Sequence, residues 1–210
     1  RKLVLCTAML LVASLSITSL HAEGLDTTEA RLIAERPDSD GASTEVTVAV
    51  FLIDIDEIDD VRQRFKVDLF IIIGWQDPRL ALPAGEGSDQ LRTIPIDEIW
   101  TPRGLVVNDR GLSPQLPLVA DVDAKGNVIQ RQRLSGEMAV DLDLREFPFD
   151  TQQLPIKIIS YQYSPDELRF SPNSKFEAAV ETFSGEGWHF RLLDTVFGEF
   201  TIADAGVSRP

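Results

Sequence analysis

The sequence predicts a single all-β domain, an antiparallel β-sandwich of the immunoglobulin-like kind, and three observations support that class. Hydrophobic residues make up 43% of the 210 residues, which is enough for one core of ordinary size. From Thr44 onward, apolar and polar residues alternate in several stretches, as they do in strands with one buried face. Pro, Gly, Asn and Asp residues typical of turns separate these stretches, and no long amphipathic helix interrupts them.

The amino-terminal residues follow the sequence of regions that is typical of a secretory signal peptide. Arg1 and Lys2 precede an apolar run over residues 3–13, and small and hydroxyl residues lead to Ala22. We therefore expect residues 1–22 to be removed on export. An uncleaved anchor is the alternative, because the run is near the lower length limit for spanning a membrane. Cleavage removes the only cysteine, Cys6, so the exported domain would fold without a disulfide.

Residues 23–43 form a polar lead-in, with a short helix expected over 27–35 and a turn over 37–41. The first strand is expected from residue 44 to about residue 53, since Val46, Val48, Val50 and Leu52 share one face. Five carboxylates follow within residues 54–60. This acidic segment is either a solvated hairpin loop or a docking site for a cation or an arginine.

The next strand is expected over residues 64–75. Its core face holds Phe65, Val67, Leu69, Ile71, Ile73 and Trp75, and its other face, expected to be partly wet, holds Lys66, Asp68, Phe70, Ile72 and Gly74. We expect the core of the domain to include Val48, Leu69, Ile71, Trp75, Leu142 and Ile156.

Later strands are indicated by alternation over residues 128–144, 154–163 and 188–197. Residues 121–127 are weakly similar to a calcium loop. Lys125 and Gln132 occupy positions where that loop needs oxygen ligands, so we expect a hairpin turn with Gly126 and Asn127 at positive φ.

Composition argues against several functions. With 34 acidic and 20 basic residues, the net charge of −14 disfavours nucleic acid or an anionic lipid surface as a partner. Beyond residue 22 the chain has one histidine, His189, and no cysteine, nucleophile elbow or zinc-ligand spacing. We expect no enzyme activity and no cofactor, with His189 as a half-exposed sheet residue. A hydrolase based on paired carboxylates is the remaining catalytic alternative.

Three segments carry a family resemblance. Residues 65–80 contain Trp75, Asp77 and the pair Arg79-Leu80; residues 99–102 read Ile-Trp-Thr-Pro and are followed by Asn108; residues 144–152 contain Phe147-Pro148-Phe149-Asp150. In this order and spacing, with Gly187-Trp188 downstream, they resemble the extracellular domain of the pentameric ligand-gated ion channels, the Cys-loop receptor superfamily. The resemblance covers about residues 44–200. We interpret Trp75 and Trp100 as structural residues of the core, since Trp75 ends the buried stripe of its strand.

Two departures from the family pattern are informative. Val140 and Leu154 stand where most members have the cysteines of the Cys loop, which resembles the prokaryotic branch. We expect these two residues to lie close together as the ends of a closed loop. The family's last extracellular strand and its four membrane helices have no counterpart within residues 1–210, so we expect residues 44–210 to be an incomplete ligand-binding domain whose membrane domain lies elsewhere in the natural chain.

The resemblance also implies site residues. Family members bind a small-molecule agonist between subunits, here of a homopentamer, and the matching positions are Phe70, Val107, Arg133 and Tyr161. Family aromatics surround cationic agonists, and a valine at one of these positions disfavours a cationic agonist here.

Asp60, Phe149 and Asp150 match positions that couple binding to the pore, where the carboxylates pair with an arginine just before the first membrane helix. The resemblance thus implies a channel domain on the extracellular or periplasmic face of a bacterial membrane. A secreted soluble binding protein of the same fold is the alternative.

Overall fold

In the computed structural model we describe residues 32–38, 40–83, 91–145, 151–175, 190, 193 and 195–198. Apart from a helical turn at residues 32–34 and a 3₁₀ turn (Pro78–Leu80), regular structure in these ranges is β. The strands are β1 (Thr44–Asp59), β2 (Arg64–Gln76), β3 (Arg92–Pro95), β4 (Gly104–Val106), β5 (Ser113–Pro114), β6 (Val119–Val122), β7 (Asn127–Ala139), β8 (Ile158–Ser160) and β9 (Leu168–Pro172). The predicted all-β class is confirmed.

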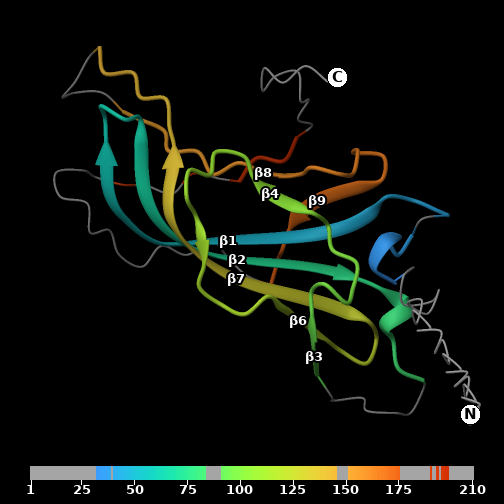
Figure 1. The fold of residues 1–210 in the computed structure, drawn as a ribbon. Coiled ribbons are helices and arrows are strands. Elements are labelled where there is room, and N and C mark those ends of the chain that lie inside the picture. The colour runs from blue at the N-terminus through green and yellow to red at the C-terminus, as the bar shows by residue number, and fades with distance from the viewer. Residues whose placement is uncertain are drawn as a thin grey trace, which may run out of the picture.

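The strands form two sheets. The larger has the order β3-β6-β7-β2-β1-β9, with β5 also paired to β7, and the smaller consists of β4 and β8. Figure 1 shows the long strands β1, β2 and β7 side by side, with the β4–β8 pair lying over them. All pairs are antiparallel except β1 with β9. The chain crosses from the smaller sheet to the larger one between β8 and β9, so β9 can run alongside β1 in the same direction.

Two hydrophobic clusters form the core, and the second of them includes residues of both sheets. One surrounds Trp75 and Trp100, and the other joins the middle of β1 and β2 to Met138 and the segment before β8. Of the expected core residues, Leu69, Ile71, Trp75 and Leu142 are buried. Val48 and Ile156 are partly buried and pack against these clusters.

Strand β1 continues through most of the acidic segment that the sequence marked as a loop. It ends at Asp59, and residues 54–59 pair with residues 64–68 of β2, with two register irregularities. The reason is an apolar residue inside the acidic run: Ile55 is buried opposite Val67, while Asp56 and Glu57 are exposed. Only residues 60–63 form the connecting turn.

The outward face of β2 is less exposed to solvent than the alternation of its residues predicts. Lys66 is exposed and Asp68 and Phe70 are half-buried, but Ile72 is 3% exposed and Gly74 is buried. At this end of the strand, Thr47 Oγ1 donates a hydrogen bond to the Gly74 carbonyl (3.2 Å) and receives one from Asn173 Nδ2 (3.3 Å). Residues that follow β9 thus cover the upper part of the face, and such a long-range contact leaves no periodic signal in β2 itself.

Residues 123–126 form the predicted hairpin turn, but of the two residues expected at positive φ only Gly126 has it, since Asn127 already begins β7. Gly126 has φ +78°, and Asp123 Oδ1 accepts the backbone N–H groups of Lys125 (2.8 Å) and Asn127 (2.8 Å). The carboxylate is therefore engaged by its own turn. Within the described ranges, no group of three or more His, Cys, Asp or Glu residues is arranged to hold a metal ion.

Other expectations fall outside the described residues: the signal peptide, residues 146–150 with Phe149 and Asp150, Trp188 and His189. The lead-in turn is present, since the Gly41 N–H donates to the Asp38 carbonyl at 3.0 Å. The described positions of the predicted strand 188–197 are not in a strand. No helix long and apolar enough to cross a membrane was found among the described residues.

We predict that Gly126→Ala destabilises the fold. A Cβ at Gly126 would lie 2.2 Å from the Asp77 carbonyl oxygen, and the positive φ adds strain of its own. The expected loss is at least about 2 kcal/mol in the free energy of unfolding, measured by urea denaturation. Gly41→Ala is the control, because nothing lies within 4 Å of its Cβ position. Equal midpoints for the two variants would contradict this account.

Candidate functional site

An aromatic stack connects β2 of the larger sheet to the segments that precede β4 and follow β8. Trp75 and Trp100 meet edge to face with ring centroids 5.9 Å apart, and Tyr163 lies against Trp100 at 5.6 Å. Trp100 is fully buried, and its Nε1–H donates to the Tyr163 hydroxyl at 2.7 Å. Both tryptophans therefore have the structural role that the buried stripe of the second strand predicts.

The stack supports two segments, which we name the Trp100 segment (residues 100–103) and the Tyr161 segment (residues 160–163). Ser160 Oγ donates to the Pro102 carbonyl at 2.8 Å, and the Tyr161 N–H donates to the Arg103 carbonyl at 3.2 Å. These bonds continue the β4–β8 ladder, in which Gly104 is opposite Ser160. The side chain of Tyr161 is 57% exposed. The hydrogen bonds between the Trp100 segment and the Tyr161 segment thus hold the backbone from which the Tyr161 side chain points into solvent.

Phe70 and Arg133 lie together on the larger sheet. They are direct partners across β2 and β7, and Phe51 of β1 is the partner of Phe70 on the other side. The Phe51 and Phe70 rings are tilted with centroids 6.3 Å apart. Sequence reasoning missed Phe51. Alternation in the sequence places Phe51 on the outward face of its strand, because its neighbours Val50 and Leu52 face the core. Placing Phe51 beside Phe70 also needs the register of β1 against β2, which depends on irregularities in β1.

Asp68 engages the guanidinium of Arg133. Arg133 Nε donates to both carboxylate oxygens, at 3.0 and 3.2 Å, and Nη2 donates to Oδ2. This hydrogen bonding, with the attraction between the opposite charges, raises the pKa of Arg133. Arg133 is therefore already matched by an internal anion, and Asp68 joins the candidate site.

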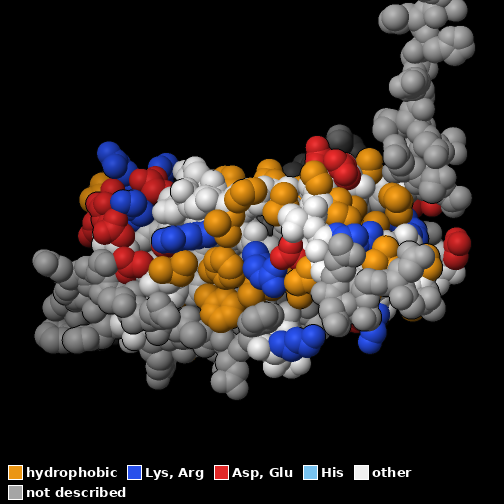
Figure 2. Space-filling view, turned by 90° about the horizontal axis from the view of Figure 1, so that it is seen from below, with side chains coloured by type: hydrophobic (Ala, Val, Ile, Leu, Met, Phe, Trp, Pro, Cys, Tyr) orange, Lys and Arg blue, Asp and Glu red, His pale blue; other side chains and the backbone are white. Residues whose placement is uncertain are grey.

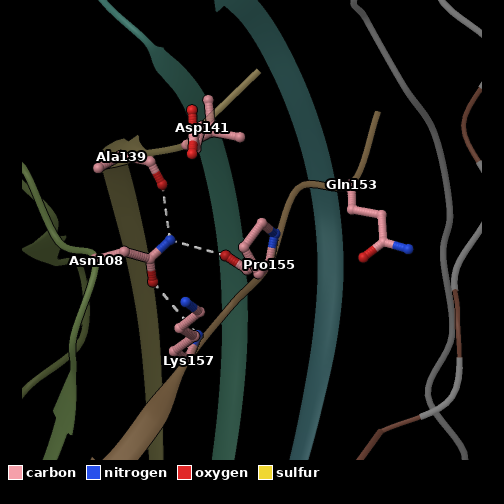
Figure 3. A pocket seen from close by; sticks show the side chains of 7 residues that line it. Asn108, Ala139, Asp141, Gln153, Pro155 and Lys157 are labelled. Carbon is pink, nitrogen blue, oxygen red and sulfur yellow. Dashed lines mark hydrogen bonds between the residues drawn. The ribbon is translucent and has the colours of Figure 1, made fainter. Parts of the chain in front are cut away.

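Val107 and Asn108 follow β4. The Val107 N–H donates to the Lys157 carbonyl at 2.8 Å, and the valine side chain is half-buried. Asn108 connects three segments: its Nδ2 donates to the carbonyls of Ala139 (2.9 Å) and Pro155 (2.8 Å), and its Oδ1 accepts the Lys157 N–H (3.3 Å), as Figure 3 shows. The Asn108 side-chain amide thus holds the end of β7 beside the segment that precedes β8.

A cavity of about 430 Å³ opens beside this amide (Figure 3). Its lining consists of Asn108, Ala139, Val140, Asp141, Gln153, Pro155 and Lys157. None of Phe70, Val107, Arg133 or Tyr161 lines it. The cavity belongs to the base of the loop over residues 141–153, and the ligand residues implied by the resemblance lie elsewhere.

The structure thus divides the four ligand-site candidates between the two sheets. Phe70 and Arg133 form a cross-strand pair on the larger sheet, whereas Val107 and Tyr161 flank β4 and β8 on the smaller one. In the described part of the chain no hydrogen bond or ring contact joins Tyr161 to Phe70 or Arg133. The four candidate positions therefore form two separate groups within the domain.

The β1–β2 turn makes specific contacts with the loop that follows β7. Gln63, with φ +53°, accepts the Val140 N–H at its carbonyl (3.0 Å) and the Leu142 N–H at Oε1 (2.6 Å). Its Nε2 donates to the Asp60 carbonyl at 2.7 Å. Asp60 itself is exposed in the turn. Sequence reasoning missed Gln63, since its role depends on contacts with residues distant in sequence.

A second glutamine closes the loop. Gln152 Oε1 accepts the Asp143 N–H at 3.0 Å, and Gln152 Nε2 donates to the Asp143 carbonyl at 2.6 Å. This reciprocal pair spans the loop near Val140 and Leu154, which belong to one hydrophobic cluster. The closeness of Val140 and Leu154 stays a prediction. Their cluster and the glutamine amide supply the packing and hydrogen bonds that a disulfide-free loop needs.

The acidic segment pairs with cations of its own domain. Lys66 Nζ donates to Asp56 at 2.7 Å, which with the nearby negative charge raises the pKa of Lys66. Arg62 Nη1 lies 3.6 Å from Asp59 Oδ2, and next to the segment Arg64 Nη1 donates to Glu137 of β7 at 2.8 Å. Figure 2 shows side chains of both charges gathered at one end of the molecule, the end where β1 turns into β2 in Figure 1. Because these pairs are exposed, they orient the turn more than they stabilise the fold.

An all-β domain with this stack, these paired segments and this closed loop has the features of a receptor extracellular domain. The family model of the neurotransmitter-gated ion-channel ligand binding domain matches residues 31–194. The chain belongs to that family, the ligand-binding domains of the Cys-loop pentameric ligand-gated channels.

Individual relatives agree with this assignment. The chain is 28% identical over 173 residues to the glycine receptor subunit beta of Rattus norvegicus, covering 79% of this chain and 35% of that protein. It is 31% identical over 114 residues to a proton-gated ion channel of Gloeobacter violaceus, covering 54% and 32%. It is 27% identical over 139 residues to the serotonin-gated chloride channel mod-1 of Caenorhabditis elegans, covering 63% and 28%. The chain spans about a third of the length of these relatives.

We predict that Tyr163→Phe destabilises the domain. It removes the acceptor of the buried Trp100 N–H, and an unpaired buried donor costs about 1–3 kcal/mol. Tyr161→Phe is the matched control, because its ring is exposed and the change should stay within about 0.5 kcal/mol. Urea denaturation of both variants measures the difference in the free energy of unfolding. An equal loss in the two variants would show that the Trp100–Tyr163 hydrogen bond does not stabilise the domain.

We also predict that Gln152→Ala loosens the closed loop. The Asp143 N–H loses its acceptor, so its hydrogen exchange should become faster by about tenfold, which corresponds to a hydrogen bond of ordinary strength. The neighbouring Gln153→Ala is the control, because Gln153 is exposed and lines the cavity without such a bond. Hydrogen exchange read residue by residue distinguishes them. Unchanged hydrogen exchange of the Asp143 N–H in Gln152→Ala would contradict the closure of the loop by Gln152.

Proposed function

We propose that this chain is the extracellular ligand-binding and gating-coupling domain of a bacterial pentameric ligand-gated ion channel. The observation that carries the proposal is a division within one domain. Tyr161 is held outward by the Trp100 segment, while Gln63 ties the β1–β2 turn to the loop after β7 and Gln152 closes that loop on Asp143. A receptor domain needs both a place for the agonist and a contact that transmits its binding.

The agonist site would lie between neighbouring subunits of a homopentamer. Tyr161 and Val107 would come from one subunit, and Phe70 with Arg133 from the next. Their placement on different sheets of one domain supports this arrangement, since two half-sites that do not meet within a subunit can meet across an interface. The exposed Tyr161 ring provides an apolar surface for a small molecule.

Coupling would pass through Asp60, Phe149 and Asp150 to the channel's own membrane domain. Asp60 is exposed at the turn whose backbone Gln63 anchors, so its carboxylate is available to an arginine outside the domain. Binding would shift the population of a bistable interface in the assembled pentamer.

Export to the outer face of a bacterial membrane is part of the proposal. Residues 1–22 read as a signal peptide, 23–43 as a lead-in and 44–210 as the receptor domain, which lacks cysteine. The match to the channel of Gloeobacter violaceus is compatible with a prokaryotic origin. We propose no catalytic role, no cofactor and no nucleic-acid partner. A soluble binding protein of the same fold is distinguished by reading the gene beyond codon 210.

Two substitutions in the complete receptor test the division. Tyr161→Ala should lower agonist potency by about tenfold or more, because a ring contact of about 1.5 kcal/mol is lost. Asp60→Asn should impair opening and leave ligand affinity largely unchanged. Currents and equilibrium binding, measured on both variants, give the two readouts. If Asp60→Asn abolished binding, or Tyr161→Ala changed neither readout, the proposed division would be wrong.

A further inference from the structure

The cavity beside Asn108 has a floor that hydrogen bonds hold in place. The Asn108 side-chain amide bonds to the carbonyls of Ala139 and Pro155 and to the N–H of Lys157, and the Asn108 carbonyl accepts the Ala139 N–H at 2.7 Å. These groups are already engaged within the domain. Recognition of a ligand in the cavity therefore falls to the side chains around its opening.

The side chains around the opening are charged or polar and are not engaged. Asp141, Gln153 and Lys157 line the cavity and are exposed, and within the described ranges none of the three side chains forms a hydrogen bond or an ion pair. Nearby on the same loop, the carboxylate of Asp143 is matched by Arg145. The described part of the cavity wall thus offers a carboxylate, an ammonium group and an amide to a ligand.

The two charges stand apart from each other. Asp141 follows β7 and Lys157 precedes β8, and Figure 3 shows them above and below the Asn108 amide, with Gln153 on the other side of the cavity from Asn108. No ion pair joins Asp141 to Lys157 in the described structure. The space between them belongs to a cavity of about 430 Å³, a volume within the range of small-molecule sites.

We propose that this cavity binds a small zwitterion, with its ammonium group on Asp141, its carboxylate on Lys157 and a hydrogen bond to Gln153. A molecule that carries both charges matches both side chains, whereas an anion or a cation alone meets one opposite charge and one like charge. The inference goes beyond the proposed function, because Phe70, Val107, Arg133 and Tyr161 do not line this cavity.

Such a ligand connects the two ends of the loop over residues 141–153. Gln152, the neighbour of Gln153, closes this loop on Asp143 through two hydrogen bonds. A ligand that needs both ends of the loop in place binds the closed form and not the open one. It should therefore slow hydrogen exchange of the Asp143 N–H, by about tenfold at a ligand concentration about nine times the Kd.

The test is titration calorimetry on the complete receptor at pH 7 and fixed ionic strength. The probes are two zwitterions of different length, L-alanine and 5-aminopentanoate, and two molecules of single charge, pentanoate and pentylamine. At least one zwitterion should bind about fivefold or more tightly than either singly charged molecule, the factor that one exposed ion pair of about 1 kcal/mol supplies. Each titration is repeated in Tyr161→Ala, which should leave this binding unchanged.

Variants of the cavity test the assignment of the two charges. Asp141→Asn and Lys157→Gln should each weaken zwitterion binding by about fivefold, and the double exchange Asp141→Lys with Lys157→Asp should restore it with the ligand reversed. Asp166→Asn and Lys125→Gln change exposed side chains elsewhere and are the matched controls. Urea denaturation checks that every variant folds as stably as the parent.

Several results would overturn the inference. Neither zwitterion binding more tightly than the singly charged molecules would do so, as would unchanged binding in both Asp141→Asn and Lys157→Gln. Binding that is lost in Tyr161→Ala and kept in the cavity variants would place the zwitterion at the proposed agonist site instead, which refutes the inference and supports the proposed function. Dissociation of the pentamer by the two cavity variants would show that a neighbouring subunit fills the cavity, and the inference would be wrong.

Discussion

The hydrogen bond from Trp100 Nε1 to the Tyr163 hydroxyl is the interaction on which the ligand-facing half of the domain depends. It lies beneath two segments that are distant in sequence and come from different turns, and the described part of the domain contains no cysteine to fix them covalently. Burial of Trp100 makes this bond expensive to break, because the indole N–H could find no water in place of the tyrosine hydroxyl. The exposed Tyr161 is then ordered by its neighbours and needs no contact of its own ring.

The opposite half uses glutamine side chains for the same purpose. Gln63 and Gln152 each accept a backbone N–H from the chain that leaves β7, and Gln152 returns a hydrogen bond to the carbonyl of the same residue. Such amide pairs reproduce one rung of a β-ladder. They are weaker than a disulfide and break reversibly, so a loop closed this way can open locally at low cost. A coupling element has to adopt two arrangements, and a reversible closure suits that requirement better than a rigid one.

Sequence alone predicted the parts of the domain that depend on local pattern. The all-β class, the second strand and the hairpin at Gly126 follow from alternation and turn chemistry. The extension of β1 to Asp59 could not be predicted from the density of charged residues. It depends on one apolar residue, Ile55, whose burial keeps the chain in the strand. Burial of Ile72 was missed because alternation within β2 does not show what covers its outward face.

The candidate site was predictable to a smaller extent, for the same reason. Motif spacing drew attention to Phe70, Arg133 and Tyr161, and strand alternation predicted that they face outward. Alternation could not reveal that Asp68 neutralises Arg133, because a bidentate pair requires the register of β2 against β7. Nor could it reveal that the buried Nε of Arg103 has no hydrogen-bond partner, since the absence of an acceptor is a property of the whole neighbourhood. Electrostatic character thus emerges from tertiary placement, as the matching of Arg133 by Asp68 shows.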